Sequence, residues 1–150
     1  MMHSLAFQEL RELALSKRQA GVLTIDFREV RTLGESSQSI PDDFVVSLGF
    51  KRLGKVWRQI ERAEALGSIE RILCCDLAYQ RPLMEEKTAT FIAESFLALF
   101  SSYGCHHCTN GSFDERSMLR WSPISDSTFD HGVVAFDDEH VGIIWAQDED

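Results

Sequence analysis

The sequence predicts an α+β fold in which N-terminal helices pack on a C-terminal antiparallel sheet that ends in a β-hairpin. Apolar residues recur at helical spacing before Gly104, whereas short apolar runs separated by Ser, Asn, Gly, Pro and Asp follow it. Of the 150 residues, 44% are hydrophobic and 10% aromatic, which is enough to bury a core without metal or disulfides. We therefore expect a single globular domain over residues 1–150.

The first part of the chain predicts one clear helix and one ambiguous segment. Apolar residues at helical spacing run from Leu5 to about Ala20, where Gly21 is expected to end the helix. Residues 22–33 mix apolar and charged side chains and fit either a short strand or a second helix, of which we favour the helix. Residues 34–39 have a loop-like composition.

Three further helix starts are predicted in the middle of the chain. Ser39 followed two residues later by Pro41 is typical of an N-cap and a first turn. Ser68 is expected to cap a short helix. Pro82 is expected to open a core helix that carries the apolar residues of segment 91–100.

The C-terminal strands are predicted from two apolar runs. Val133–Phe136 and Val141–Trp145 are separated by the polar residues 137–140, which is typical of a β-hairpin. Both arms are apolar on both faces, so we expect helices to cover one side of this strand pair and other strands to flank it. Leu119–Trp121 is a candidate third strand, and the sheet is expected to pack on the helix at 91–100.

The net charge of -9 is concentrated at the C-terminal end of the chain. Residues 121–150 contain eight of the 24 acidic residues and none of the 15 Lys and Arg residues. A field of one sign attracts a basic surface and repels nucleic acid and anionic membranes. We therefore expect a protein partner, with no nucleic acid and no membrane. The eight acids are Asp126, Asp130, Asp137, Asp138, Glu139, Asp148, Glu149 and Asp150.

A cytoplasmic location with reduced thiols is expected. No charged leader precedes an apolar segment, and no apolar run reaches the roughly 18 residues of a membrane span. Of the four cysteines, Cys74 and Cys75 are adjacent and cannot readily bridge each other. Thiols in a reducing compartment fit this pattern better than disulfides.

Cys105, His106, His107 and Cys108 form the most suggestive cluster of site residues. A C-x-x-C pair can supply half of a tetrahedral zinc site, and His can add nitrogen ligands, but a second pair at suitable spacing is missing. A Cys–His nucleophile pair is a further alternative. We favour ordinary loop or strand residues here, and we expect no metal and no cofactor.

Other patterns favour structural interpretations. Lys51, Lys55, Arg58 and Arg62 would form one basic stripe if their segment were helical, and that stripe fits a solvated face, a nucleic-acid site or pairing with the acidic end of the chain. Of these we favour the solvated face. Acidic residues near the Pro82 helix start are explained by the helix dipole, and tryptophans are more often core than contact residues. Since no phosphate-loop, dinucleotide, zinc-protease or serine-hydrolase motif occurs, no enzymatic activity is predicted.

The pattern of residues 132–136, Asp137-Asp138, Val141–Trp145 and 148–150 resembles that of small bacterial immunity proteins, which neutralise polymorphic or contact-dependent growth-inhibition toxins. The resemblance implies a non-enzymatic protein that binds one cognate toxin domain, often a basic nuclease, and blocks it. The alternatives are a metal-binding enzyme or regulator that uses the Cys105–Cys108 cluster, and an adaptor or assembly protein. On charge, the expected partner-binding residues are Asp137, Asp138, Glu139, His140, Trp145, Asp148, Glu149 and Asp150.

Overall fold

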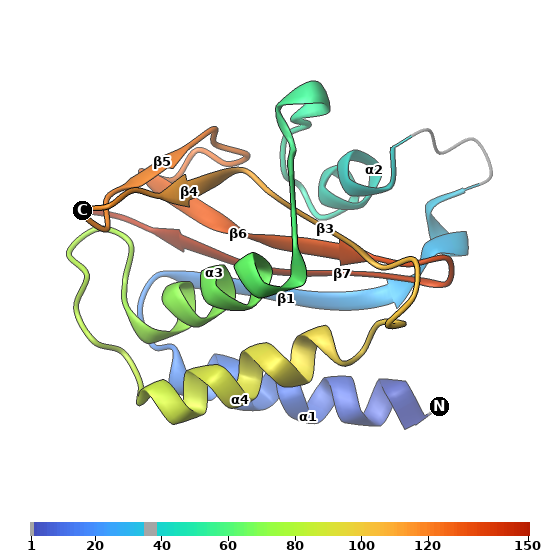
Figure 1. The fold of residues 1–150 in the computed structure, drawn as a ribbon, viewed down its shortest axis with the longest axis horizontal. Helices are drawn as coiled ribbons and strands as arrows, with labels where there is room; N and C mark the ends of the chain where they lie inside the picture. Colours follow the sequence, from blue (N-terminus) through green and yellow to red (C-terminus); the bar gives the residue numbers. More distant parts are fainter. Residues whose placement is uncertain (1, 35–38) are drawn as a thin grey trace.

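The computed structural model describes residues 2–34 and 39–150 and has the α+β architecture that the sequence predicts. Figure 1 shows the helices gathered mainly in the N-terminal part of the chain and the strands mainly in the C-terminal part. In chain order the elements are α1 (Met2–Lys17), β1 (Val22–Glu29), the 3₁₀ turn η1 (Val30–Leu33), α2 (Ile40–Ser47), the 3₁₀ turn η2 (Gly54–Val56), β2 (Arg58–Ile60), α3 (Arg62–Cys74), α4 (Glu86–Leu97), β3 (His106–Thr109), β4 (Gly111–Phe113), β5 (Leu119–Trp121), β6 (Phe129–Phe136) and β7 (His140–Asp148).

The main sheet has five antiparallel strands in the order β1-β7-β6-β3-β2. The predicted hairpin is present as β6 and β7, in which Phe136 pairs with Val141 across the turn. Strands flank the hairpin on both edges, as its apolar arms require. The predicted strand Leu119–Trp121 is also present, but it pairs with β4 in a separate two-stranded sheet.

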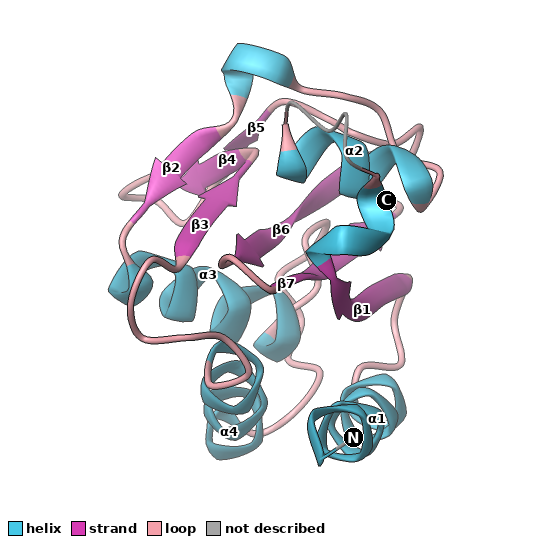
Figure 2. Ribbon diagram, turned by 90° about the vertical axis from the view of Figure 1, so that its right-hand side faces the viewer, coloured by secondary structure: helices cyan, strands magenta, loops and turns pink. Residues whose placement is uncertain are grey.

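Helices cover both faces of the main sheet (Figure 2). α1, α3 and α4 lie on one face and α2 on the other, so the alternating side chains of β7 enter two cores. Ile144 and Ala146 belong to the larger core with α1, α3 and α4, whereas Ile143 and Trp145 belong to the smaller core with α2.

The helix predicted at 91–100 corresponds to α4, but α4 is not the main helix that packs on the sheet. α3 lies against β6, β3 and β7, and α4 packs chiefly against α3 and α1. α4 approaches the sheet at Gly142, where the Phe96 and Phe100 rings occupy the space that a side chain would need. The sheet therefore packs mainly on α3, whereas the sequence analysis predicts that it packs on the helix at 91–100.

Three predicted features of the helices are wrong. Residues 22–29 form an edge strand rather than a helix, because they pair with β7 along their whole length. Ser68 is buried inside α3, which begins at Arg62 instead. Pro82 forms a β-bridge with Cys75, so α4 begins only at Glu86.

Other predictions of the first half of the chain are confirmed. The first helix is present and ends at Lys17, a little before its expected end. The N-cap is also present, since the Ser39 side chain accepts a hydrogen bond from the backbone N–H of Asp42. Of the loop expected at 34–39, residues 35–38 lie outside the described residues. Within the described part of the chain, no helix has both the length and the apolar character of a membrane span.

Candidate functional site

The acidic end of the chain is largely used inside the protein. Asp130, Asp137 and Asp148 are buried, and the exposed Asp126 forms an ion pair with Lys51 at 2.6 Å. Glu149 accepts hydrogen bonds from the backbone N–H and the hydroxyl of Thr128, so five of the eight acids have partners within the protein. Asp138, Glu139, Glu149 and Asp150 are exposed.

Asp148 was expected to contact a partner, but it is buried against Arg18. The Arg18 guanidinium donates two hydrogen bonds to its carboxylate, at 3.0 Å and 2.7 Å, and the backbone N–H of Leu77 donates a third at 2.8 Å. Asp148 is thus a structural residue. The sequence analysis missed this because the cation comes from the other end of the chain.

Trp145 is fully buried and is likewise not a surface contact residue. It lies on the α2 side of β7, where its ring meets Trp57 edge to face at 6.0 Å. Its indole N–H donates to Asp130 at 3.2 Å, and Asp130 also accepts bonds from Asn110 and from the backbone of Ile124. Trp145 and Asp130 therefore form a satisfied polar pair within the core.

Asp137 holds the turn between β6 and β7. Its carboxylate accepts the backbone N–H groups of Glu139 at 2.8 Å, His140 at 2.7 Å and Ser101 at 2.8 Å. Burial raises the pKa of Asp137, but these hydrogen bonds and the nearby His140 outweigh it and keep the pKa below its ordinary value. His140 is half-buried and stacks on Phe27 at 4.8 Å. Asp137 is thus a buried structural residue of the turn, whereas Asp138 and Glu139 are exposed.

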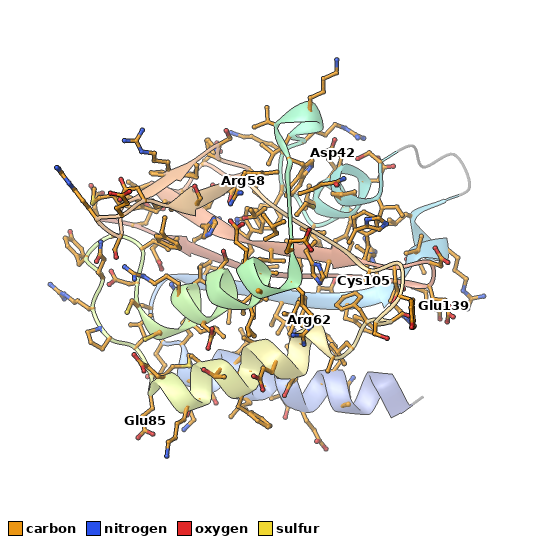
Figure 3. All side chains as sticks on the ribbon, viewed as in Figure 1. Asp42, Arg58, Arg62, Glu85, Cys105 and Glu139 are labelled. Atoms are coloured by element: carbon orange, nitrogen blue, oxygen red, sulfur yellow. The ribbon has the colours of Figure 1, made fainter. Side chains whose placement is uncertain are left out.

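The two exposed acid clusters lie at opposite ends of the hairpin. Glu139 lies at one end of the molecule in Figure 3, whereas the C-terminus lies at the other end in Figure 1. The nine-residue strand β7 separates them by about 30 Å at roughly 3.3 Å per residue. The two clusters therefore lie at separate ends of the hairpin. The hairpin tip also has an aromatic neighbour that the sequence analysis missed. The backbone N–H of Ser101 donates to Asp137, and the same loop carries Tyr103, which is 88% exposed.

Strand alternation divides the Cys105–Cys108 cluster between the two faces of the sheet. Cys105 and His107 lie on the α3 and α4 side, whereas His106 stacks on Phe136 and Cys108 enters the core with α2. Cys105 and Cys108 are three positions apart, and because this offset is odd, the two side chains of a C-x-x-C pair in extended backbone point to opposite faces of the sheet. Residues 2–34 and 39–150 contain no group of three or more His, Cys, Asp or Glu side chains placed to hold a metal ion.

Cys105 and His107 form a close pair in which burial favours the neutral form of both groups. The Cys105 Sγ lies 3.5 Å from His107 Nε2. Burial and the charge of Asp137 raise the pKa of the Cys105 thiol to about 11. Burial, with smaller effects of Arg62 and His106, lowers the pKa of His107. The thiol is thus not activated as a nucleophile, since activation requires a lowered thiol pKa.

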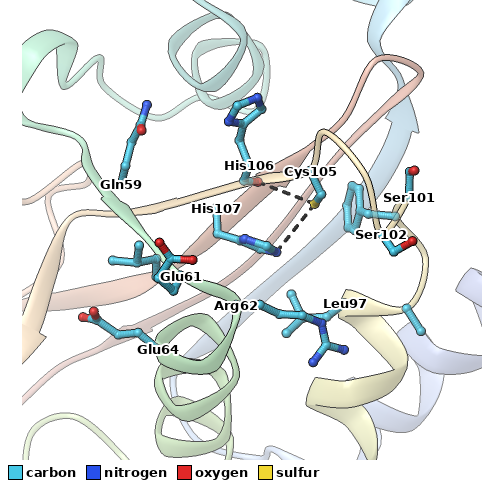
Figure 4. Close-up of a pocket in the computed structure, with 13 residues that line it drawn as sticks. Gln59, Glu61, Arg62, Glu64, Leu97, Ser101, Ser102, Cys105, His106 and His107 are labelled. Carbon is cyan, nitrogen blue, oxygen red and sulfur yellow. Dashed lines mark hydrogen bonds between the residues drawn. The ribbon is translucent and has the colours of Figure 1, made fainter.

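This pair lines a cavity of about 960 Å³ between the end of β2, the start of α3, the end of α4 and the start of β3. Figure 4 shows Arg62 extending beneath the Cys105–His107 pair toward Leu97. Ser101, Ser102 and Gln59 also line it. The spacing of Cys105 and His107, two residues apart at a strand start, is the signal in the sequence that would have predicted a shared face.

The predicted basic stripe does not form, because its residues lie on different elements. Lys51 precedes η2, Lys55 lies within η2, Arg58 begins β2 and Arg62 begins α3. Arg58 pairs with Glu64, and the pair between Lys51 and Asp126 matches the alternative in which these bases bind the acidic end of the chain.

Comparison with protein-family models, with curated proteins and with solved structures finds no match to this chain.

Proposed function

We propose that the protein is a cytoplasmic, non-enzymatic immunity protein that binds and neutralises a cognate, basic toxin domain. The binding surface is the hairpin tip with Asp138, Glu139 and the adjacent Tyr103. The observation that carries the proposal is the anchoring of this tip by Asp137, which fixes two exposed carboxylates on a rigid turn.

The composition of the hairpin tip supports a protein partner. Exposed acids on a rigid scaffold steer a cationic partner and raise its association rate. Tyr is enriched among the residues that dominate binding energy at protein interfaces. The Tyr103 side chain is largely exposed and is therefore accessible to a partner. A nuclease domain with a cationic substrate site has the complementary charge, whereas nucleic acid and anionic membranes are repelled.

The state of the cysteine cluster supports binding over catalysis. Its four side chains point to two faces of the sheet, and burial favours the neutral form of both groups in the Cys105–His107 pair. Neither the metal-binding alternative nor a thiolate nucleophile gains support from this arrangement.

The test is affinity for the product of the neighbouring gene, co-expressed or added as a purified domain. We expect a tight complex whose association rate falls with salt, and a slower association for the D138N/E139Q variant. The matched control is E149Q/D150N, which removes the same charge at the other end of the hairpin and should leave the rate nearly unchanged.

Two results would overturn the proposal. One is the absence of binding to any co-encoded basic toxin domain, and the other is equal behaviour of the two double variants. Self-association in light scattering without a toxin complex would instead favour the assembly-protein alternative.

A further inference from the structure

The cavity beside Cys105 and His107 has no role in the surface proposed above. It lies on the α3 and α4 side of the sheet, and its volume of about 960 Å³ falls in the range of small-molecule sites. Its walls are mostly polar side chains rather than apolar ones. A cavity of this character is suited to a polar ligand.

Arg62 supplies the positively charged side chain that lines this cavity. The neighbouring bases are paired, Arg58 with Glu64, Arg52 with Asp43 at 3.0 Å and Lys51 with Asp126. Within residues 2–34 and 39–150, the structure gives Arg62 no carboxylate partner. Arg62, Cys105 and His107 line the same cavity, and Figure 4 shows the Arg62 side chain beside the Cys105–His107 pair.

Several other polar side chains of the cavity can donate hydrogen bonds. Ser101 accepts a bond from the backbone N–H of Tyr103, so its hydroxyl hydrogen can be directed elsewhere. Ser102 and Gln59 add a hydroxyl and a carboxamide to the lining. Glu64 is already neutralised by Arg58, which leaves the Glu61 carboxylate as the opposing charge on the cavity wall.

We propose that this cavity binds a small polar molecule through its oxyanion, which is a carboxylate or a phosphate group. Arg62 is the principal residue that binds this oxyanion. A guanidinium presents paired N–H donors that match the geometry of either oxyanion. The hydroxyls of Ser101 and Ser102 supply further donors. Glu61 sets the selectivity of the cavity, because it repels a simple anion and favours a ligand that also carries a hydrogen-bond donor or a positive group.

Titration with inorganic phosphate and with acetate tests this proposal at pH 7 and constant ionic strength. The readout is the ring Cε1–H signal of His107 in NMR spectra, which reports directly from the cavity. We expect a saturable shift of this signal, and the tighter-binding probe identifies the oxyanion as phosphate or carboxylate.

Three variants test the role of Arg62. R62A should weaken binding at least about tenfold, the factor that one charge-assisted hydrogen bond supplies. Lys55 is exposed like Arg62 but does not line the cavity, so K55A removes the same charge elsewhere and should change binding by less than about twofold. R62K keeps the charge without the paired donors and should fall between R62A and the natural protein.

A fourth variant tests the opposing charge. E61Q removes the repulsion and should tighten the binding of both probes. Equal effects of R62A and K55A, or a His107 signal that does not move with either probe, would overturn the proposal. None of these outcomes depends on the toxin, so the site is tested independently of the proposed function.

Discussion

Arg18 and Asp148 form a buried bidentate ion pair that joins the two ends of the chain. The two residues are 130 positions apart, and their side chains are almost completely buried. Arg18 also donates to the carbonyl oxygens of Ala20 and Ile72, at 2.6 Å each, and Asp148 accepts the N–H of Leu77. The pair therefore ties the end of α1, the end of α3 and the last strand together.

Removing one charge of this pair should destabilise the fold strongly. We expect Asp148→Asn to lower the free energy of unfolding by about 3–5 kcal/mol, because a buried guanidinium is left without its countercharge. Urea denaturation followed by circular dichroism measures the effect. Asp150→Asn, at an exposed position, is the control and should have little effect. A small loss for Asp148→Asn would mean that water reaches Arg18.

Gly21→Ala should disturb the same ion pair from the backbone side. Gly21 has a φ of 55°, and a Cβ there would overlap the Asp148 side chain and the carbonyl oxygen of Gln147. We expect a loss of about 2–4 kcal/mol in thermal or urea unfolding, from the strained φ together with the overlap. Gly49→Ala is the matched control, since Gly49 also has a positive φ, of 94°, but has open space around it. Equal losses at both positions would exclude the overlap with Asp148 as a cause.

The parts of the fold that could be predicted from the sequence are those set by local chemistry. The hairpin turn and the Ser39 cap each depend on a few consecutive residues. The strand at 22–29 could not be distinguished from a helix, because its conformation depends on pairing between Val22 and Gln147. Pairing of that range costs loop-closure entropy and leaves no local pattern.

The candidate site was predictable only in part, because a charge count does not separate buried acids from exposed ones. Asp138 and Glu139 are exposed as expected, whereas Asp148 is neutralised by a cation at the far end of the sequence. The position of Trp145 could have been inferred, since alternation from Ile143 places it on the same covered face. Arg62 and Cys105 come together only through the packing of α3 against β3, which no spacing in the sequence reveals.

His131 should make the protein sensitive to acid. Its Nδ1–H donates to the Asn110 side-chain oxygen at 2.9 Å, while its Nε2 is buried without a partner. Burial, with a smaller effect of Arg58, lowers the pKa of His131 from 6.5 to about 4. Between these two pH values the unfolded chain binds a proton that the folded chain does not, so the free energy of unfolding falls as the pH falls.

The contribution of His131 over this range is on the order of 3 kcal/mol. His131→Asn keeps a donor near the Nδ1 position and removes the titration. Urea unfolding of both proteins between pH 7 and pH 4 should show a shallower decline for the variant. Parallel declines would assign the acid sensitivity to other groups.

Asp137→Ala should loosen the hairpin tip and the loop at 101–104 together. The variant leaves the N–H groups of Ser101, Glu139 and His140 without their acceptor. We expect a loss of about 2 kcal/mol in unfolding free energy and faster amide exchange at these three positions. Since the pKa of Asp137 lies below its ordinary value, its stabilisation is complete above that ordinary value and is lost as the pH falls through the folded pKa. Asp138→Ala, one residue on and exposed, should leave both measurements nearly unchanged.

Alkylation of Cys105 tests whether its pair with His107 is chemically inert. Burial and Asp137 raise the thiol pKa to about 11 from an ordinary value of 9.0, so the reactive thiolate is roughly 100-fold scarcer at pH 8 than for an unperturbed thiol. Iodoacetamide labelling, resolved by peptide mass spectrometry, should therefore be slow at Cys105 near pH 8 and should accelerate until the pH exceeds the thiol pKa of about 11. R62A should slow it further, because Arg62 is the charge that lowers this pKa. Rapid labelling at neutral pH would instead indicate a thiolate–imidazolium pair, and a catalytic function would then explain the cavity better than a binding one.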